Sequence, residues 1–274
     1  MSGNIYEKNL IELADPDICK FIADLTSRFD IERKKRDRSG IYGYTQRAFA
    51  YNSNRIEGST LTERQTASLF ETGTIEPDTE AIRAKDVEEM TGHFSMFNTV
   101  LDTRSEALTE ALIKLYHRHL KAGVFEDMAN GYPVGEYKNR KNIVSDITTA
   151  SPEGVHARMA ALLNAYNDLH EVRLINLCRF HVIYESIHPF QDGNGRTGRA
   201  ILFKECLKNN IMPFIIRDEN KLKYISALHK AQIEKNYDAL EELFKEEQEK
   251  YFNAAKDFLK EKNTDIDIDV EYEL

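Results

Sequence analysis

The chain has 274 residues, 41% of them hydrophobic and 30% charged, which is the composition of a globular protein rather than of a disordered one. Its 37 Lys and Arg residues against 46 Asp and Glu give a net charge of −9, so general nucleic-acid binding is not expected. The three cysteines are widely separated and predict neither a metal site nor a disulfide framework, as is typical of a reducing compartment.

Helical spacing dominates the chain, which contains only 13 Gly and 6 Pro. Apolar residues at steps of three and four predict an amphipathic helix over about 15–36. Thr62 followed by Gln65 resembles a capping box at the start of another helix. The same spacing predicts further helices over about 82–103, 108–123, 153–170, 173–187, 196–209, 220–234 and 237–261.

We therefore expect an all-α fold in three segments. These are an N-terminal helical region (1–80), a central domain (81–235) and a C-terminal helix with an acidic tail (236–274). In the tail, acidic and apolar residues alternate from Asp265 to Leu274. This pattern indicates either a strand that pairs with the sheet edge of a partner or a frayed terminus.

The segment from about 44 to 58 predicts one more helix, because Gly and Pro are absent from its first half and Gly58 suits a helix end. Ser53 and Glu57 are four residues apart, so they lie on one face of that helix. Judged by residue type alone, Glu57 is an exposed surface acid, as most Glu residues are.

Residues 132–151 interrupt the helical rhythm. Gly135 and neighbouring turn residues precede the β-branched pair Ile143 and Val144. This pattern predicts a short β-hairpin or an extended flap.

The densest functional signal lies between two apolar helical segments, 173–187 and 200–207. Pro189 disfavours helical geometry at His188, so we expect the first helix to stop there. A short polar loop is thus held at both ends by the core.

This loop favours an anion. Gly193, Asn194 and Gly195 precede a helix N-terminus and permit a backbone that turns successive N–H groups toward a phosphate. Arg196 and Arg199 are three residues apart and project from one side of the first turn. Because cations oppose the macrodipole at a helix N-terminus, two of them there indicate a ligand to be held.

Two further side chains of the loop supply chemistry. Asp192 offers a hard oxygen ligand where Mg²⁺ commonly bridges protein and nucleotide. His188 titrates near neutrality and can remove a proton from an attacking hydroxyl. Together the loop predicts a site of phosphoryl or nucleotidyl transfer, whereas each residue taken singly fits an ordinary connection between two helices.

The segment His188-Pro-Phe-Gln-Asp-Gly-Asn-Gly-Arg-Thr-Gly-Arg199 resembles the Fic-family signature HPFxDGNGRxxR at every defined position. The resemblance implies a helical bundle with a small β-hairpin flap. It also implies transfer of AMP from ATP to a Thr, Tyr or Ser hydroxyl, on a target protein or on the protein itself.

The resemblance also implies roles for single residues. His188 would be the general base, and Asp192 would bind the Mg²⁺ that accompanies ATP. The residues that bind the nucleotide would be Gly193, Asn194, Gly195, Arg196 and Arg199, with Arg199 on the γ-phosphate.

Gly195 bears on the kind of reaction. The related Doc toxins, which transfer phosphate, resemble this loop but carry Lys at the position of Gly195. A Lys side chain would fill the space that the outer phosphates need, whereas Gly leaves it open. The resemblance therefore favours transfer of AMP over transfer of phosphate.

Ser53-Asn-Arg-Ile-Glu57-Gly58 resembles the inhibitory motif [S/T]xxxE[G/N] of the same family. The resemblance implies that Glu57 pairs with Arg199 and denies the γ-phosphate its partner, since a carboxylate competes directly with phosphate for one guanidinium. A role for Glu57 in removing AMP from modified targets is the alternative that the sequence does not separate from inhibition.

The flap also resembles its counterpart in the Fic family, which holds an extended target segment beside the active site. On this resemblance the residues that contact the target are Gly135, Glu136, Tyr137, Ile143 and Val144. An ordinary surface hairpin is the alternative. His117 and His119 are two apart and form a poor metal pair, so we expect both to be packing or surface residues.

Two other functions stay open at this point: a nucleotide-binding regulatory module, and a Fic enzyme with a different donor. The expected partners are ATP and a protein target, with the N-terminal helices offering a face for a homodimer. No apolar run approaches the roughly 20 residues of a membrane helix, and the first twenty residues carry four acids, unlike a signal peptide. We therefore expect a cytoplasmic protein without membrane or nucleic-acid partners.

Overall fold

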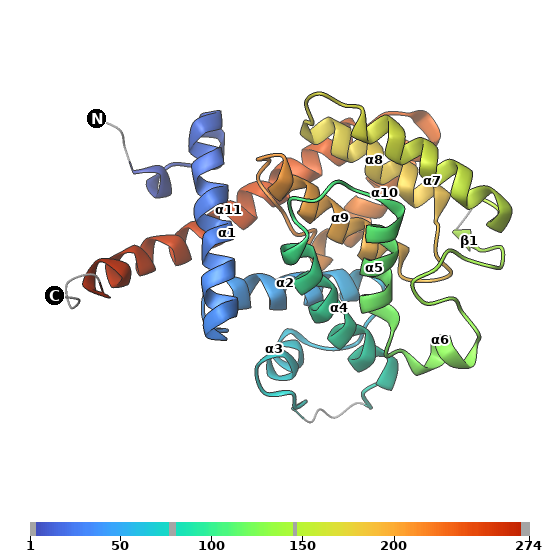
Figure 1. The fold of residues 1–274 in the computed structure, drawn as a ribbon, viewed down its shortest axis with the longest axis horizontal. Helices are drawn as coiled ribbons and strands as arrows, with labels where there is room; N and C mark the ends of the chain where they lie inside the picture. The colour runs from blue at the N-terminus through green and yellow to red at the C-terminus, as the bar shows by residue number, and fades with distance from the viewer. Residues whose placement is uncertain (1–3, 77–80, 145–146, 270–274) are drawn as a thin grey trace.

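The computed structural model describes residues 4–76, 81–144 and 147–269, and these residues confirm the all-α prediction (Figure 1). The N-terminal helices are α1 (Asp15–Lys35), α2 (Ile41–Ile56) and α3 (Glu63–Thr72), preceded by the 3₁₀ turns η1 (Ile5–Glu7) and η2 (Leu10–Glu12). The central helices are α4 (Ala84–Asp102), α5 (Glu110–Lys121), α6 (Phe125–Ala129), α7 (Pro152–Asn167), α8 (Leu174–Ile187) and α9 (Asn194–Lys208). After the 3₁₀ turn η3 (Asp218–Asn220), the chain ends in α10 (Lys221–Glu234) and α11 (Asp238–Asp269).

Two helices at the centre of the bundle carry the polar loop predicted above. Both α8 and α9 are buried for most of their length. Apolar residues cover most sides of α8, whereas the buried positions of α9 also include charged residues such as Arg196 and Arg199. Around them, α2, α4 and α5 contact α9, whereas α7 and α10 contact α8 (Figure 1). The loop between α8 and α9 is therefore fixed by packing on several sides.

One hydrophobic core joins the three predicted segments of the chain. The ring of Phe49 in α2 lies 5.5 Å from that of Phe203 in α9 and 5.8 Å from that of Phe97 in α4. Tyr251 of α11 packs edge-on against Phe203 at 5.8 Å between centroids. The end of α2 is therefore held against α9 by shared core contacts.

Element boundaries follow local chemistry, with a few departures from the predictions. The capping box at Thr62 and Gln65 forms at the start of α3, and α8 ends at Ile187, as Pro189 predicts. The helix after the loop begins at Asn194, two residues earlier than we predicted.

The described part of the acidic tail is helical and does not form the strand that its alternation allowed. Residues 265–269 belong to α11, and residues 270–274 of the tail lie outside the described residues.

The predicted hairpin is reduced to two residue pairs. Strand β1 (Ile143–Val144) pairs antiparallel with β2 (Ile147–Thr148), with Ile143 opposite Thr148 and Val144 opposite Ile147. The preceding residues, 132–142, form turns and irregular backbone rather than a strand. Within 4–76, 81–144 and 147–269, no helix is both long and apolar enough to cross a membrane.

Candidate active site

His188 lies at the point where α8 gives way to the loop. Its backbone adopts a left-handed conformation with φ 52°, and its N–H donates to the carbonyl of Tyr184. The imidazole is largely buried, and this burial together with the nearby Lys138 ammonium lowers the pKa of His188 to about 4. The side chain is therefore neutral at pH 7, as a general base has to be.

Asn194 shapes the loop through both of its amide atoms. Its Oδ1 accepts a hydrogen bond of 2.8 Å from the Phe190 N–H, and its Nδ2 donates to the Phe190 carbonyl at 2.9 Å. We predicted a nucleotide-binding role for Asn194, but the structure places its side chain inside the protein, where it holds Phe190 in position. Gly193, with φ 81°, supplies the left-handed turn into α9.

The backbone at the start of α9 provides the predicted anion site. Within the first turn, only Thr197 reaches back to a loop carbonyl, that of Gly193 at 3.0 Å. The N–H groups of Asn194, Gly195 and Arg196 precede the first helical hydrogen bond and have no carbonyl one turn earlier in the helix to bond. An anion placed there is favoured by these donors and by the helix dipole.

Asp192 is held at this helix start in its ionised form. Its Oδ1 accepts a hydrogen bond of 2.7 Å from the Gly193 N–H, and its Oδ2 lies 2.7 Å from Nζ of Lys121. Although burial favours the protonated acid, the charges of Arg196 and Lys121 hold the pKa of Asp192 well below its usual range. The carboxylate is still 35% exposed, so both oxygens stay near the surface of the site.

Arg196 does not face the anion site in the way we predicted. Its side chain is 2% exposed and forms a two-pronged ion pair with Glu89 of α4, with N···O distances of 2.5 and 3.0 Å. Its NH1 also donates to Oδ1 of Asn54 in α2 at 3.2 Å. The guanidinium therefore supports the loop from beneath rather than projecting from the helix surface.

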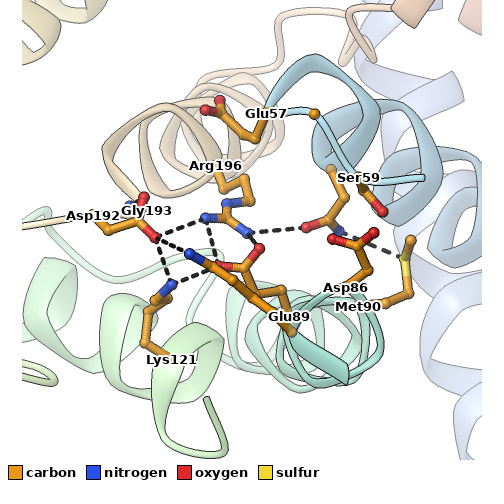
Figure 2. A network of polar contacts seen from close by, with 12 residues as sticks. Glu57, Ser59, Asp86, Glu89, Met90, Lys121, Asp192, Gly193 and Arg196 are labelled. Carbon is orange, nitrogen blue, oxygen red and sulfur yellow. Dashed lines mark hydrogen bonds and ion pairs between the residues drawn. The ribbon is translucent and has the colours of Figure 1, made fainter. Parts of the chain in front are cut away.

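Sequence reasoning missed the network to which Arg196 belongs (Figure 2). Glu89 lies between Arg196 and the fully buried Lys121 of α5, whose Nζ is 2.5 Å from Glu89 and 2.7 Å from Asp127. Lys121 carries the chain of ion pairs on to Asp192 (Figure 2).

Arg199 meets the predicted inhibitory residues of α2. Its NH2 lies 2.7 Å from Oε1 of Glu57 and 3.0 Å from the carbonyl of Ser53, and its Nε donates to Oγ of Ser53 at 2.9 Å. The Arg199 side chain is 3% exposed and that of Glu57 is 34% exposed. The structure thus brings together Ser53, Glu57 and Arg199 from segments almost 150 residues apart.

The Glu57 carboxylate lies directly over the start of α9. A Cβ atom added to Gly195 would be 2.3 Å from Oε1 of Glu57 and 2.9 Å from NH1 of Arg199. The glycine therefore leaves room for a negatively charged oxygen at this position, and a side-chain carboxylate fills that room.

A second contact that the sequence did not reveal holds the residues after Glu57. Gly58 has φ 92° and its carbonyl accepts a hydrogen bond from Arg83. Asp86 of α4 accepts from the N–H of Thr60 at 2.8 Å and from its hydroxyl at 2.7 Å. The end of α2 is therefore tied to the start of α4.

The first half of the flap packs onto the core instead of extending from it. Gly135 adopts φ 73° against the side chain of Arg118, and Glu136 pairs with Lys114 at 2.8 Å. The Tyr137 ring is buried, 5.6 Å from that of Phe190. We predicted these three residues as target contacts, yet Tyr137 is covered and Glu136 is paired within the protein. Ile143 and Val144 form β1, as described above.

A single protein carboxylate marks the expected metal position. Across 4–76, 81–144 and 147–269, no group of three or more His, Cys, Asp or Glu residues is arranged to hold a metal ion. Asp192 alone fits a Mg²⁺ that takes its remaining ligands from phosphate and water, which is the usual arrangement in nucleotide sites.

Comparisons with known proteins agree with this geometry. A family model described as Fic/DOC family matches residues 107–206, which include α5, the flap, α8 and most of α9. The protein adenylyltransferase Fic of Nematostella vectensis is 29% identical over 191 residues, which are 66% of this chain and 42% of that protein. The protein adenylyltransferase fic-1 of Caenorhabditis elegans is 24% identical over 231 residues, which are 82% and 44% of the two chains. The chain thus spans less than half the length of these curated relatives.

Solved structures show the same fold. A Fic domain containing signaling protein from Bacteroides thetaiotaomicron superposes with a TM-score of 0.72 at 25% identity, covering 89% of this chain and 97% of that one. Fic-1 of C. elegans superposes with a TM-score of 0.66 at 19% identity, covering 92% and 73%, a likeness of fold alone.

Proposed function

The chain carries a Fic/DOC family domain, and from that premise we propose that it is a protein adenylyltransferase restrained by its own Glu57. The observation that carries the proposal is the loop between α8 and α9. There a neutral His188, an ionised Asp192 and the free N–H groups of α9 surround one anion site. Curated relatives named as protein adenylyltransferases support the same reaction.

In this reaction a hydroxyl oxygen of the target attacks the α-phosphorus of ATP. The new P–O bond forms as the bond to the β-phosphate oxygen breaks, and pyrophosphate leaves. His188 takes the hydroxyl proton on its imidazole, which its lowered pKa keeps neutral beforehand. The N–H groups at the start of α9 hold the phosphates and stabilise the charge that develops on them.

Asp192 would be the protein ligand of a Mg²⁺ ion that accompanies ATP. When bound there, the ion would neutralise phosphate charge between the two groups that the reaction separates. The chain contributes an ionised carboxylate whose position is fixed by Gly193 and Lys121.

Glu57 would restrain the enzyme by occupying the place of the outer phosphate. Its carboxylate engages Arg199 and covers Gly195, so a triphosphate cannot use Arg199 while that ion pair is intact. A carboxylate and a phosphate compete for one guanidinium because both accept the same pair of N–H donors.

The target would approach along the flap. Strand β1 offers a short extended backbone after the packed residues 135–138, and such an edge can pair with an extended target segment. Because Tyr137 is buried and Glu136 is paired with Lys114, target contact would fall to the residues around β1 rather than to the start of the flap.

The test distinguishes the two phosphates of ATP that can be transferred. The Glu57→Gly protein is incubated with Mg²⁺ and ATP labelled at either the α- or the γ-phosphate, together with the same protein carrying His188→Ala. We expect label from the α-phosphate alone, and none without His188. Label from the γ-phosphate would mean that the protein is a kinase and would contradict the proposal.

A further inference from the structure

His117, which we expected to be a packing or surface residue, contacts three parts of the candidate site. It lies on α5 with a side chain that is 2% exposed. Its ring stacks on that of Phe190 with centroids 3.9 Å apart and planes only 5° from parallel. Phe190 is part of the loop that follows His188, so the stacking joins α5 to that loop.

Both ring nitrogens of His117 are engaged. Nδ1 accepts a hydrogen bond of 2.9 Å from the N–H of Gly135, at the start of the flap. Nε2 lies 3.0 Å from the main-chain carbonyl of Asp192. Because Gly135 can only donate, Nδ1 has to be the unprotonated nitrogen, and Nε2 therefore carries the proton that it donates to Asp192.

Glycines stand at two positions where the backbone comes close to α5. Gly135 has φ 73°, and a Cβ there would lie 2.7 Å from Nε of Arg118. A Cβ on Gly193 would lie 3.5 Å from Cδ2 of His117 and 3.2 Å from the Leu120 side chain. Glycine thus lets both the flap and the loop approach the same face of α5.

We propose that His117 is a positioning residue that fixes the start of the flap and the Asp192 loop to one another. The proposal rests on the proposed function, because its consequence is the alignment of a target segment, held by the flap, with the phosphates held by the loop. It assigns no proton transfer to His117, which touches neither reacting group.

Other contacts between flap and loop do not replace this one. The N–H of Lys138 donates to the Pro189 carbonyl at 2.9 Å, and Asn142 donates to the Phe190 carbonyl at 3.0 Å. Both of these hold the flap to the first half of the loop, whereas His117 reaches Asp192 itself.

Three substitutions separate the two hydrogen bonds. His117→Gln can place an amide nitrogen near the position of Nε2 and so keep the contact with Asp192. His117→Asn can place an amide oxygen near the position of Nδ1 and so keep the contact with Gly135. Phe keeps the stacking on Phe190 and loses both. His119→Gln is the control, because His119 lies two residues along the same helix and contacts Ser95 at 3.0 Å.

Two measurements are made on each protein in the Glu57→Gly background. One is hydrogen–deuterium exchange at the Gly135 amide, and the other is the affinity for a non-hydrolysable ATP analogue with and without Mg²⁺. Labelled AMP transfer is followed alongside. Replacing a residue that orients a metal ligand through a hydrogen bond typically lowers metal affinity or activity by roughly 10- to 100-fold. We expect His117→Phe to lower AMP transfer by a factor of that size.

The expected pattern is selective. His117→Gln exchanges faster at Gly135 but keeps the gain in affinity from Mg²⁺, His117→Asn shows the reverse, and His117→Phe loses both. Unchanged exchange and unchanged Mg²⁺ dependence in His117→Phe would overturn the proposal. So would equal losses in Gln and Asn, which would indicate a purely structural role. If the Glu57→Gly parent transfers no AMP, the proposed function fails, while exchange at Gly135 still decides the role of His117.

Discussion

At the scale of single residues, the proposed restraint depends on the ion pair between Arg199 and Glu57. Arg199 is almost fully buried, and its Nε and NH2 donate to Glu57 and to both oxygens of Ser53, so these donors are engaged within the protein. Of the two partners, Glu57 can be replaced with less loss of stability. Its side chain is 34% exposed, and the residue lies at the C-terminal end of α2.

Replacing Glu57 should therefore open the site. A hydrogen bond between charged groups contributes about 1.5–3 kcal/mol, and the exposure of Glu57 puts its contribution near the lower value. We expect Glu57→Gly to raise ATP affinity roughly tenfold, since 1.4 kcal/mol is a factor of ten. Calorimetric titration with ATP measures this, with Glu63→Gly, an exposed acid on α3, as the control. Equal affinity of the Glu57→Gly and unmodified proteins for ATP would show that Glu57 does not compete with the phosphate.

His188 gives a prediction about pH. An ordinary histidine is half protonated near pH 6.5, whereas the pKa of His188 is lowered to about 4 by burial and by Lys138. Its base form is therefore retained as the pH falls from 7.5 to 5.5. In the Glu57→Gly protein we expect AMP transfer to change little over that range. A tenfold drop in transfer per pH unit below pH 6.5, measured at saturating nucleotide, would contradict this account of His188.

The residues recovered from sequence and those missed differ in one physical respect. His188, Asp192 and Arg199 lie within one short stretch of sequence, from the end of α8 to the first turns of α9, so their spacing alone reveals them. Glu89 and Lys121 acquire meaning only through Asp192, which is 71 residues from Lys121. No local pattern predicts such a contact, because the tertiary packing of α4 and α5 creates it.

At the scale of secondary-structure elements, α2 and α4 together position the Glu57 carboxylate. α2 ends at Ile56, and the following residues are fastened to α4 by Arg83 and Asp86. Glu57 thus lies between a helix end and a fixed turn.

Loosening that turn should weaken inhibition without touching the site. Asp86→Ala removes two hydrogen bonds to Thr60, so Glu57 is held less firmly against Arg199. We expect AMP transfer to rise, by less than in Glu57→Gly, and no further rise when both changes are combined. Asp102→Ala, at the exposed far end of α4, is the control. A full additive gain in the double variant would mean that Asp86 acts independently of Glu57.

Element boundaries were predicted well where a single residue sets them, and poorly where tertiary contacts do. Pro189 fixes the end of α8, and Thr62 fixes the start of α3. The flap was expected as a hairpin because of its turn residues and β-branched pair. Residues 135–138 instead follow the surface of α5 and the loop, since Gly135 and Tyr137 find partners there.

At the scale of the whole molecule, the shared core makes α2, the helix that precedes Glu57, an integral part of the fold. Phe49 of α2 stacks on Phe203 of α9, the helix that starts at the anion site. Glu57 can therefore separate from Arg199 without displacement of α2, because the contacts with Arg199 come from Ser53 and Glu57 at the C-terminal end of α2.

Buried histidines should make the stability of the protein sensitive to acid. Burial lowers the pKa values of His93, His117 and His181 to about 3 and that of His188 to about 4. Below pH 6.5 the unfolded chain binds protons at these sites and the folded chain does not, so stability falls as the pH is lowered. Each site contributes up to roughly 1.4 kcal/mol per pH unit in that window.

One buried acid acts in the opposite direction. Burial raises the pKa of Glu185 to about 8, so the folded state holds a proton there that the unfolded state releases above about pH 4.5. Four histidines outweigh one acid between pH 6.5 and 4.5. Urea unfolding at pH 7.0, 6.0 and 5.0 should give a decreasing free energy of unfolding. A constant or increasing value would show that these histidines are not buried in neutral form.

The central claim is that this protein transfers AMP and that Glu57 prevents it. The most direct test is the intact mass of the protein after incubation with Mg²⁺ and ATP, measured for the unmodified chain, Glu57→Gly, and Glu57→Gly with His188→Ala. We expect the mass to increase by one adenylyl group in Glu57→Gly, far less in the unmodified chain, and not at all without His188. A mass increase in the variant that lacks His188, or equal increases with and without Glu57, would contradict this account.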